Sequence, residues 1–395
     1  MDYFKRSLAL HKKLHGKLSV NSKTKIRDSR DLSLIYTPGV VQASREIFRN
    51  PKKAFDLTIK GNTVAVVTDG SSVLAQGSIG ALASLPVMEG KCVLFKELAG
   101  INAFPIAIDA HEPKKIVEIV RNISPAFGGI NLEDISAPRC FEIEAGLQDC
   151  LQIPVFHDDQ HGTAIVVLAA LLNACRVAGK KFSELKVVVN GAGAAGIAIA
   201  RLLSCGLMSR KLCTPVREVV VVDSKGIISG ERKGLERHKK HLLHYTNERG
   251  VSGVLSDALE GADAFVGVSI GNVLKPEWIK LMAKKPIIFA LSNPIPEIMP
   301  DRARKAGAFI VGTGRSDFPN QVNNALAFPG VWGGALEAKA TMVSDSMKVA
   351  AAKSIAGYIK KPARNRIMPS VLDKRLHTAV AGAVKKAAAV VRKNS

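Results

Sequence analysis

The 395-residue chain contains few aromatic residues, 5% of the total, and only six cysteines. No two cysteines have the Cys-x-x-Cys spacing that is typical of redox and zinc motifs. We also expect no secretory signal and therefore predict reduced, mostly buried thiols in a cytoplasmic protein. The longest apolar stretch, Ala164 to Leu172, is too short to cross a bilayer, so we expect no membrane segment. The cysteines are Cys92, Cys140, Cys150, Cys175, Cys205 and Cys213.

Acidic residues are also scarce, with 34 of them against 56 basic residues and a formal net charge of +22. The excess lies at the two ends, because residues 1–60 carry +9, residues 346–395 carry +11 and the middle carries only +2. A chain whose main surface binds nucleic acid should be basic along that surface, so this distribution argues against a nucleic-acid partner. Hydrophobic residues make up 47% of the chain, which excludes a disordered protein, and the length predicts two domains.

The second half of the chain alternates apolar, strand-like runs with helix-like stretches, which predicts an α/β fold with a parallel sheet. An apolar segment with helical composition, Ala164–Val177, precedes this alternation, and Thr163 is a plausible cap for it. The domain boundary is therefore expected near residues 160–180. The tail from about residue 341 is expected to be helical, with interruptions near Pro362 and Pro369. The predicted strands are Asn62–Asp69, Lys186–Asn190, Glu218–Asp223, Ala264–Val268, Ile287–Leu291 and Phe309–Val311.

A glycine-rich motif, Gly191–Gly196 (GAGAAG), follows a predicted strand and precedes a predicted helix. G-x-G-x-x-G alone is weak evidence, but this context is the one that dinucleotide binding requires. The first glycine permits the tight turn, the second lets the pyrophosphate approach the backbone, and the third lets helix and strand pack closely. The alternative is a glycine turn in an α/β domain that binds nothing. The candidate cofactor contacts are Gly191, Gly193, Ala194, Ala195 and Gly196.

An acidic residue, Asp223, ends the next predicted strand, where it could accept hydrogen bonds from the adenine ribose. This favours NAD, because a 2′-phosphate would lie against a carboxylate. Basic residues follow soon afterwards and would favour NADP, with Lys225 as the best candidate for a phosphate contact. The alternative for most of these bases is a solvated helix face, so the choice between NAD and NADP stays open.

Two pairs of adjacent carboxylates, Glu133-Asp134 and Asp158-Asp159, are candidate metal ligands. Clustered carboxylates at the end of an element suit a hard cation such as Mg²⁺ or Mn²⁺, whereas solvated loop acids are the alternative. His157 and His161 have a spacing that could hold zinc on a helix. We rank zinc lower, because no cysteine or third histidine lies nearby in the sequence.

Two further residues are candidates for acid–base chemistry. Tyr36 is one of only four tyrosines, and Lys91 precedes an apolar run. A desolvated lysine near a bound cation can lose its proton and act as a base. Taken alone, each residue favours a structural role over a catalytic one.

Long segments of the chain together resemble malic enzymes, in the short prokaryotic form. The resemblance covers roughly residues 5–380, and its motifs are specific and follow the order of the family. The matching segments are DLSLIYTPGV (31–40), VAVVTD (64–69), LPVMEGKCVLF (85–95), FGGINLEDISAPRCFEIE (127–144), IPVFHDDQHGTA (153–164), VNGAGAAG (189–196), FALSNPIPE (289–297) and TGRSDFPNQVNNALAFPG (313–330).

The resemblance implies an N-terminal α/β domain for substrate and metal, residues 1–162, and a C-terminal Rossmann-type doubly wound domain for NAD(P), residues 163–395, with a helical tail. It also implies oxidative decarboxylation of L-malate to pyruvate and CO₂, with Mg²⁺ or Mn²⁺ polarising the C2 oxygen. Carried over by position, Lys91 is the general base, Tyr36 is the general acid, and Asp158 sets their protonation. The implied metal ligands are Glu133, Asp134 and Asp159, and the implied substrate contacts are Asn293 (also near the cofactor), Asn323 and Asn324.

The resemblance leaves some points open. Ser72 stands where larger malic enzymes carry an arginine for a substrate carboxylate, and Gln76 stands where a small or apolar residue is expected. A malolactic enzyme, which releases lactate, would share the same scaffold, metal and NAD. An inactive, basic nucleic-acid-binding relative is a third reading, against which the intact acid–base and metal set argues. The family suggests a homodimer or a higher homo-oligomer, with N-terminal segments at the interface.

Overall fold

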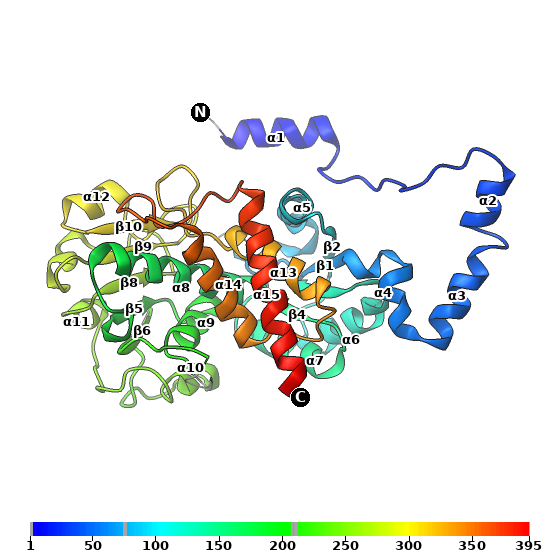
Figure 1. The fold of residues 1–395 in the computed structure, drawn as a ribbon. Coiled ribbons are helices and arrows are strands. Elements are labelled where there is room, and N and C mark those ends of the chain that lie inside the picture. Colours follow the sequence, from blue (N-terminus) through cyan, green and yellow to red (C-terminus); the bar gives the residue numbers. More distant parts are fainter. Residues whose placement is uncertain (1–2, 74–76, 207, 209–211, 395) are drawn as a thin grey trace.

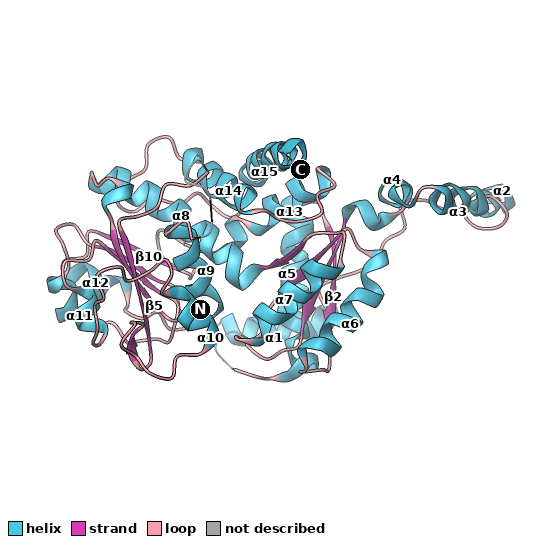
Figure 2. Ribbon diagram, turned by 90° about the horizontal axis from the view of Figure 1, so that it is seen from below, coloured by secondary structure: helices cyan, strands magenta, loops and turns pink. Residues whose placement is uncertain are grey.

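Two mainly parallel sheets form the cores of two halves of the chain, which lie side by side (Figures 1 and 2). A computed structural model describes residues 3–73, 77–206, 208 and 212–394, so Gln76 lies outside the described residues. The sheet of the first half has the strand order β2-β1-β3-β4, and that of the second half has the order β10-β9-β8-β5-β6-β7. In the second sheet, strands are added on one side of β5 as far as β7 and then on its other side from β8 onward. This switch in strand order beside β5 is the usual place for a nucleotide in an open α/β sheet.

Every strand predicted from its apolar run is present. The strands of the first sheet are β1 (Thr63–Thr68), β2 (Asn102–Ala107), β3 (Gly129–Leu132) and β4 (Val155–His157). Those of the second are β5 (Lys186–Asn190), β6 (Glu218–Asp223), β7 (Gly226–Ile227), β8 (Ala264–Gly267), β9 (Ile287–Ala290) and β10 (Ile310–Thr313). Except for the antiparallel β6–β7 pair, the strands pair in parallel. The predicted α/β class is therefore confirmed.

Four strands lacked a clear signal in the sequence. Pro105 lies inside β2, Asn131 lies inside β3, and β4 and β7 contain only three and two residues. A proline cannot donate to a ladder, and a buried polar side chain interrupts an apolar run. Parallel neighbours on both sides compensate β3, which pairs with β1 and β4.

Helices cover both sheets. The longer ones are α5 (Gly80–Ala99), α6 (Pro113–Ile123), α7 (Arg139–Cys150), α8 (Asp158–Ala178), α9 (Ala194–Leu203), α13 (Phe328–Glu337), α14 (Asp345–Tyr358) and α15 (Lys374–Asn394). The shorter ones are α4 (Ala54–Leu57), α10 (Arg237–Leu242), α11 (Leu255–Leu259) and α12 (Pro300–Lys305). Single 3₁₀ turns are η1 (Pro51–Lys53), η2 (Ile59–Asn62), η3 (Ser124–Ala126), η4 (Phe182–Glu184), η5 (Pro276–Leu281) and η6 (Asn324–Leu326). Helix α8 packs against both α9 and α14 beside the second sheet.

Helix α8 connects the two halves and begins earlier than predicted. Its first residue is Asp158, and its N-cap position is His157 rather than Thr163. The early start follows from β4, which ends at His157 and leads directly into the helix without a loop. By length and composition alone α8 could cross a membrane, but 72% of its most apolar window is buried inside the protein. It is therefore a core helix, as its packing against α9 and α14 indicates.

The C-terminal tail is helical and interrupted, as predicted. Helix α14 ends at Tyr358 and α15 begins at Lys374, so both Pro362 and Pro369 lie in the connection. Helix α15 packs on α13, α14 and α5, and so links the tail back to the first half of the chain.

The N-terminal arm, defined here as α1 (Tyr3–Leu14), α2 (Ser29–Ile35) and α3 (Val40–Arg49) with their connections, contrasts with this packed body. None of its three helices has a buried residue. Figures 1 and 2 show α2 and α3 projecting away from both sheets. Large apolar side chains are nevertheless exposed along the arm, including Leu34 at 74% and Phe48 at 90%.

The prediction of six reduced cysteines is wrong for one pair, because Cys205 and Cys213 form a disulfide. Cys205 adopts a left-handed backbone conformation just after α9, with φ of +53°. The turn brings its Cα atom within 5.8 Å of that of Cys213. Spacing in the sequence does not reveal such a local turn. Cys92, Cys140 and Cys175 are buried free thiols, whereas Cys150 is exposed.

Candidate active site

The carboxylate pairs lie together because they follow neighbouring parallel strands. Strands β3 and β4 pair with Leu132 opposite His157, so Glu133 and Asp134 emerge beside Asp158 and Asp159. One carboxylate oxygen from each of Glu133, Asp134 and Asp159 lies within 4.8 Å of the others. These three residues, here called the carboxylate trio, are those that the resemblance implied as metal ligands.

The electrostatics of the trio fit a divalent cation. Burial and the neighbouring Asp159 raise the pKa of Asp134 to about 8, and burial raises the pKa of Glu133 well above its usual range. The Oδ2 atom of Asp134 is buried without a hydrogen-bond partner. Asp134 also has a φ of +55°, a left-handed conformation that costs energy in a residue with a side chain. Buried, unpartnered carboxylate oxygens are the ligands that Mg²⁺ and Mn²⁺ prefer.

Lys91 reaches the same place from α5. Its ammonium group donates to Glu133 Oε1 at 2.9 Å and to Asp158 Oδ2, and it lies 4.0 Å from the centre of the Phe328 ring. Burial disfavours the charged form, but the carboxylates of Asp158 and Glu133 outweigh burial and raise the pKa of Lys91. The expected lowering of this pKa is therefore absent, because the lysine is paired as well as desolvated.

Asp158 is fully buried at the start of α8 and joins Lys91 to the second half of the chain. Its Oδ2 atom also accepts a 2.7 Å hydrogen bond from Asn324 Nδ2 in η6. Gly162 makes room for this carboxylate, because a Cβ atom there would lie 1.9 Å from Asp158 Oδ1. The structure thus brings Lys91, Asp158 and Asn324 together with the trio, where the two halves of the chain meet.

Two buried residues, neither of them predicted as a site residue, hold Glu133 in place. Asn131 Nδ2 donates to Glu133 Oε2 at 2.9 Å, and Trp332 Nε1 donates to Asn131 Oδ1 at 3.0 Å. Gly129 is needed beneath the indole, since a Cβ atom there would lie 2.0 Å from the Trp332 ring. A polar residue inside a buried strand was the available signal for Asn131, because such a group requires a partner.

A second buried network supports Asp159 and accounts for both histidines. His157 Nε2 lies 3.3 Å from Asp159 Oδ2, and the backbone N–H of His157 donates to Glu144 Oε1. His161 Nε2 also contacts Glu144, at 2.9 Å. Gln160 Nε2 lies 3.0 Å from Glu144 and 2.9 Å from His157 Nδ1. The histidines are therefore paired with carboxylates, and among the described residues neither joins the metal-type cluster.

The glycine turn has the shape that the motif predicts. Gly191 has a φ of +126°, and a Cβ atom at Gly196 would lie 1.7 Å from Gly191 O. Gly193 faces open space, with nothing within 4 Å of its Cβ position. Helix α9 begins at Ala194, directly after Gly193, so the backbone N–H groups of Ala194 and Ala195 have no partner within the helix. An open glycine before a helix N-terminus fits a pyrophosphate.

Asp223 ends β6, as predicted, but the structure pairs it with different bases. Arg232 donates to both carboxylate oxygens, at 2.8 and 3.0 Å, and Lys239 Nζ lies 3.3 Å away. The pKa of Asp223 is lowered, because these bonds outweigh burial. The backbone N–H of Lys225 donates to Asp223 Oδ1 at 2.9 Å. Arg232 and Lys239, rather than Lys225, are thus the bases at this carboxylate.

Three predicted residues are placed apart from the cluster or used otherwise. Tyr36 follows α2 in the N-terminal arm, which projects away from both sheets (Figure 1), and it is 67% exposed. Asn323 caps η6, because its Oδ1 accepts the N–H of Ala325 and its Nδ2 donates to Gly314 O. Asn293 follows β9 and is partly exposed beside Gly314.

Comparison with known proteins gives one consistent result. The model "Malic enzyme, NAD binding domain" matches residues 160–389, and "Malic enzyme, N-terminal domain" matches residues 15–115. A "Bifunctional malic/malolactic enzyme" of Bacillus subtilis is 51% identical, over 98% of this chain and 93% of that protein. An "NAD-dependent malic enzyme" of Geobacillus stearothermophilus is 48% identical, over 97% of this chain and 78% of that protein. The crystal structure of an NAD-dependent malic enzyme from Thermotoga maritima is 50% identical with a TM-score of 0.90, and covers 96% of this chain and 98% of that one.

Proposed function

The chain belongs to the malic enzyme family, and we propose that it oxidatively decarboxylates L-malate to pyruvate and CO₂ while reducing NAD⁺ or NADP⁺. The observation that carries the proposal is the buried contact of Lys91 with Asp158 and Glu133, beside the carboxylate trio. The proposed base, its orienting carboxylate and the proposed cation ligands lie side by side, and this is the set that removal of a hydroxyl proton requires.

We propose that Glu133, Asp134 and Asp159 hold Mg²⁺ or Mn²⁺. The unpartnered Oδ2 of Asp134 and the raised pKa values of Asp134 and Glu133 support this, because a bound cation would compensate both. When bound, the cation would act as a Lewis acid toward the C2 oxygen, and the oxidised nicotinamide would accept the hydride from C2.

The residues of this chain would supply the proton transfers. Lys91 takes the proton of the C2 hydroxyl, and Asp158 keeps the lysine oriented through its direct contact. Once Glu133 is committed to ligation, Lys91 loses one of the two carboxylates that hold its proton, which lowers its pKa toward that of a useful base. Oxaloacetate then loses CO₂, and a second group must protonate C3. Asn324 and Asn293 are proposed to bind the substrate.

We propose that Tyr36 protonates C3 in the site of a second copy of this chain. The exposed apolar side chains of the arm, such as Leu34 and Phe48, support a homodimer in which this arm is covered. An arm that projects from its own body can reach a neighbouring body, and this places the acid where one chain lacks it. We therefore expect each active site to contain residues of two subunits.

The family establishes a nicotinamide cofactor, and we propose that this chain accepts both NAD and NADP. The carboxylate of Asp223 would accept ribose hydroxyls, which suits NAD. Its charge is, however, already neutralised by Arg232 and Lys239. A 2′-phosphate bound beside Asp223 would therefore meet two cations.

We also propose a division into two domains, residues 1–162 and 163–395, with the boundary in the first turns of α8. We propose a cytoplasmic location.

A malolactic activity, releasing lactate, is the second candidate function. The observation that favours it is the 51% identity to a relative whose name includes both activities. The two reactions differ in whether the reduced cofactor leaves or is used again to reduce the product. Only the product distinguishes them, because both need the same base, metal and cofactor.

The test is turnover of L-malate by purified enzyme with Mn²⁺ and either NAD⁺ or NADP⁺. We expect the absorbance of reduced cofactor to rise in step with pyruvate. Lactate without accumulation of reduced cofactor would instead support the malolactic reaction. No consumption of malate by folded, Mn²⁺-loaded protein with either cofactor would refute both.

A further inference from the structure

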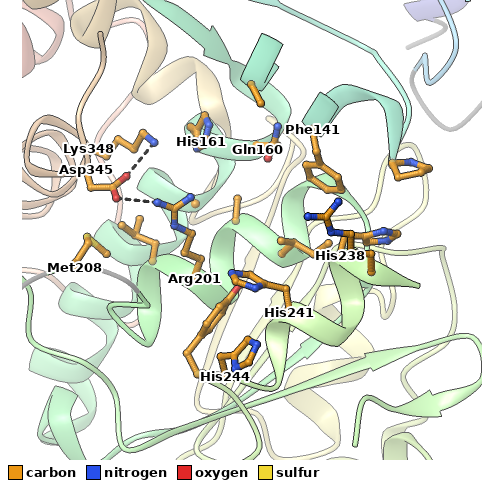
Figure 3. Close-up of a pocket in the computed structure, with 18 of the residues that line it drawn as sticks. Phe141, Gln160, His161, Arg201, Met208, His238, His241, His244, Asp345 and Lys348 are labelled. Atoms are coloured by element: carbon orange, nitrogen blue, oxygen red, sulfur yellow. Dashed lines mark hydrogen bonds and ion pairs between the residues drawn. The ribbon is translucent and has the colours of Figure 1, made fainter. Parts of the chain in front are cut away.

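A cavity of about 670 Å³ lies outside the proposed catalytic site, between α7 of the first half and α9, α10 and α14 of the second (Figure 3). Its volume is within the range of ordinary ligand sites. None of the carboxylate trio, Lys91 or the glycine-turn residues lines it. The proposed reaction therefore does not explain this cavity.

One side of the cavity carries a buried cation with spare donors. Asp345 is shared between Arg201, at 3.1 Å, and Lys348, at 3.0 Å (Figure 3), and Lys348 also interacts electrostatically with Glu144. Lys348 is only 8% exposed, and among the described residues its ammonium donates a hydrogen bond to Asp345 alone, although an ammonium has three N–H groups. A buried cation with unused donors favours an anion beside it.

The opposite side, formed by α7 and α10, offers flat rings as well as the charged residues Glu142, Arg237 and Lys240. Phe141 of α7 and His238 of α10 lie with ring centres 5.6 Å apart, and Figure 3 shows both across the cavity from Asp345. Between the two sides, α9 contributes an apolar floor of Ile197, Ala198 and Leu202. Ring faces and apolar carbon suit a planar heterocycle.

We propose that this cavity binds an organic phosphate that carries a planar ring, in the class of a nucleoside monophosphate. The phosphate lies against Arg201 and Lys348, and the ring lies against Phe141 and His238. Both contact pairs join different elements, and the ring pair joins the two halves of the molecule. A ligand that fills the cavity therefore contacts both halves of the molecule. The proposed active site lies where the same two halves meet.

The same cavity touches the network behind the metal site. His161 lines it and contacts Glu144, and Glu144 in turn holds the backbone of His157 beside Asp159. Occupancy thus has a direct physical route to a trio member, in addition to bridging the two halves. This second part of the proposal, an effect on malate binding, rests on the proposed function, whereas binding itself does not.

Binding is tested by calorimetric titration of the Mn²⁺-loaded, full-length protein with its dinucleotide site saturated by NAD⁺. The probes are adenosine 5′-monophosphate, adenosine and inorganic phosphate, at constant ionic strength. We expect one site per chain for the monophosphate and at least tenfold weaker binding of the other two probes, because each lacks half of the contacts. No binding of the monophosphate under NAD⁺ saturation would overturn the proposal, since the cavity would then have no ligand of this class or only serve the cofactor.

Variants assign the binding to the cavity. Arg201→Gln removes a cation, and Ala145→Trp fills the mouth from an exposed position on α7 without overpacking the core. Each should weaken the monophosphate by about tenfold or more, which corresponds to the loss of a charge-assisted bond or of the space itself. Lys233→Gln, an exposed charge outside the cavity, is the matched control and should change the affinity by less than about twofold. Equal affinities in all three variants would place the ligand elsewhere and refute the site.

The coupling is tested separately by malate saturation curves with and without the monophosphate. We expect the half-saturating malate concentration of the unmodified protein to shift, and that of Ala145→Trp to stay unchanged. Binding without any shift would refute the coupling but leave the site. Binding in a protein that does not consume malate would refute the proposed function and leave the site, so the two failures are distinguishable.

Discussion

The two members of the proposed acid–base pair lie in opposite surroundings. Lys91 belongs to a buried cluster, whereas Tyr36 belongs to the exposed N-terminal arm. Lys91 is 7% exposed and has two carboxylate partners, whereas Tyr36 is 67% exposed on an arm whose helices bury nothing. The packed core of one chain positions the proposed base, the proposed metal ligands and the glycine turn. The acid has no such support, so its position depends on what covers the arm.

The largest expected effect is in the buried region. Lys91→Ala removes the proposed base, and malate oxidation should fall by about 10³-fold or more, at the upper end of what general base catalysis contributes. Lys96→Ala is the matched control, because Lys96 lies on the same helix but bonds only to Asn102 at the surface. Initial rates at saturating malate, Mn²⁺ and cofactor measure both. Near-normal rates for Lys91→Ala would remove the lysine from the base role.

The second effect tests whether the arm acts on another copy. Tyr36→Phe should lower turnover by about 10²-fold, since it removes one proton donor and leaves the buried cluster intact. Mixing it with Lys91→Ala, after dissociation and reassociation, should restore activity to about a quarter of normal, because half of randomly formed dimers contain one intact site. A mixture as inactive as its components would show that acid and base must come from the same chain.

The contrast also explains what the sequence could predict. The glycine turn is predictable from the sequence because strand, turn and helix are consecutive. Local spacing is therefore enough to assign Gly191 and Gly196 to the turn. The trio was only a candidate, because Glu133 and Asp159 meet through the pairing of β3 with β4. The support from Trp332 to Asn131 links residues 201 positions apart, and no local pattern encodes it. Tyr36 could be assigned a role by resemblance, but its exposed position was not predictable from the sequence.

The third prediction concerns the metal and again separates the two regions. Saturating Mn²⁺ should stabilise the protein by about 2–3 kcal/mol at concentrations near 100 times its dissociation constant. Asp134→Asn should abolish most of this gain, because the carboxylate with the unpartnered oxygen is lost. Thermal unfolding with and without Mn²⁺ measures the effect, and Tyr36→Phe should keep the full gain. An undiminished gain in Asp134→Asn would mean that the trio is not the Mn²⁺ site.

A smaller effect is expected one layer behind the trio. Trp332→Phe keeps the ring but removes the donor to Asn131, which leaves a buried acceptor unsatisfied. The free energy of unfolding should fall by about 1–3 kcal/mol. The affinity for Mn²⁺ should weaken by about tenfold, because Glu133 loses its orientation. Trp278→Phe in η5 is the control, and its Mn²⁺ affinity, measured by calorimetry, should be unchanged. A similar loss of Mn²⁺ affinity in both variants would contradict a specific role of Trp332.

The smallest effect on folding is expected in the arm, and it completes the comparison. Phe48 is 90% exposed on α3, so Phe48→Ser should change the free energy of unfolding of the body by no more than about 0.5 kcal/mol, as for other exposed positions. If a second copy covers the arm, the same change removes apolar area from that interface and shifts the dimer toward monomer. Denaturant unfolding at low protein concentration measures the first quantity, and sedimentation velocity over a concentration series measures the second. Unchanged association with unchanged stability would mean that Phe48 is solvated in the assembly, and the covering of the arm would then have to rest on other residues such as Leu34.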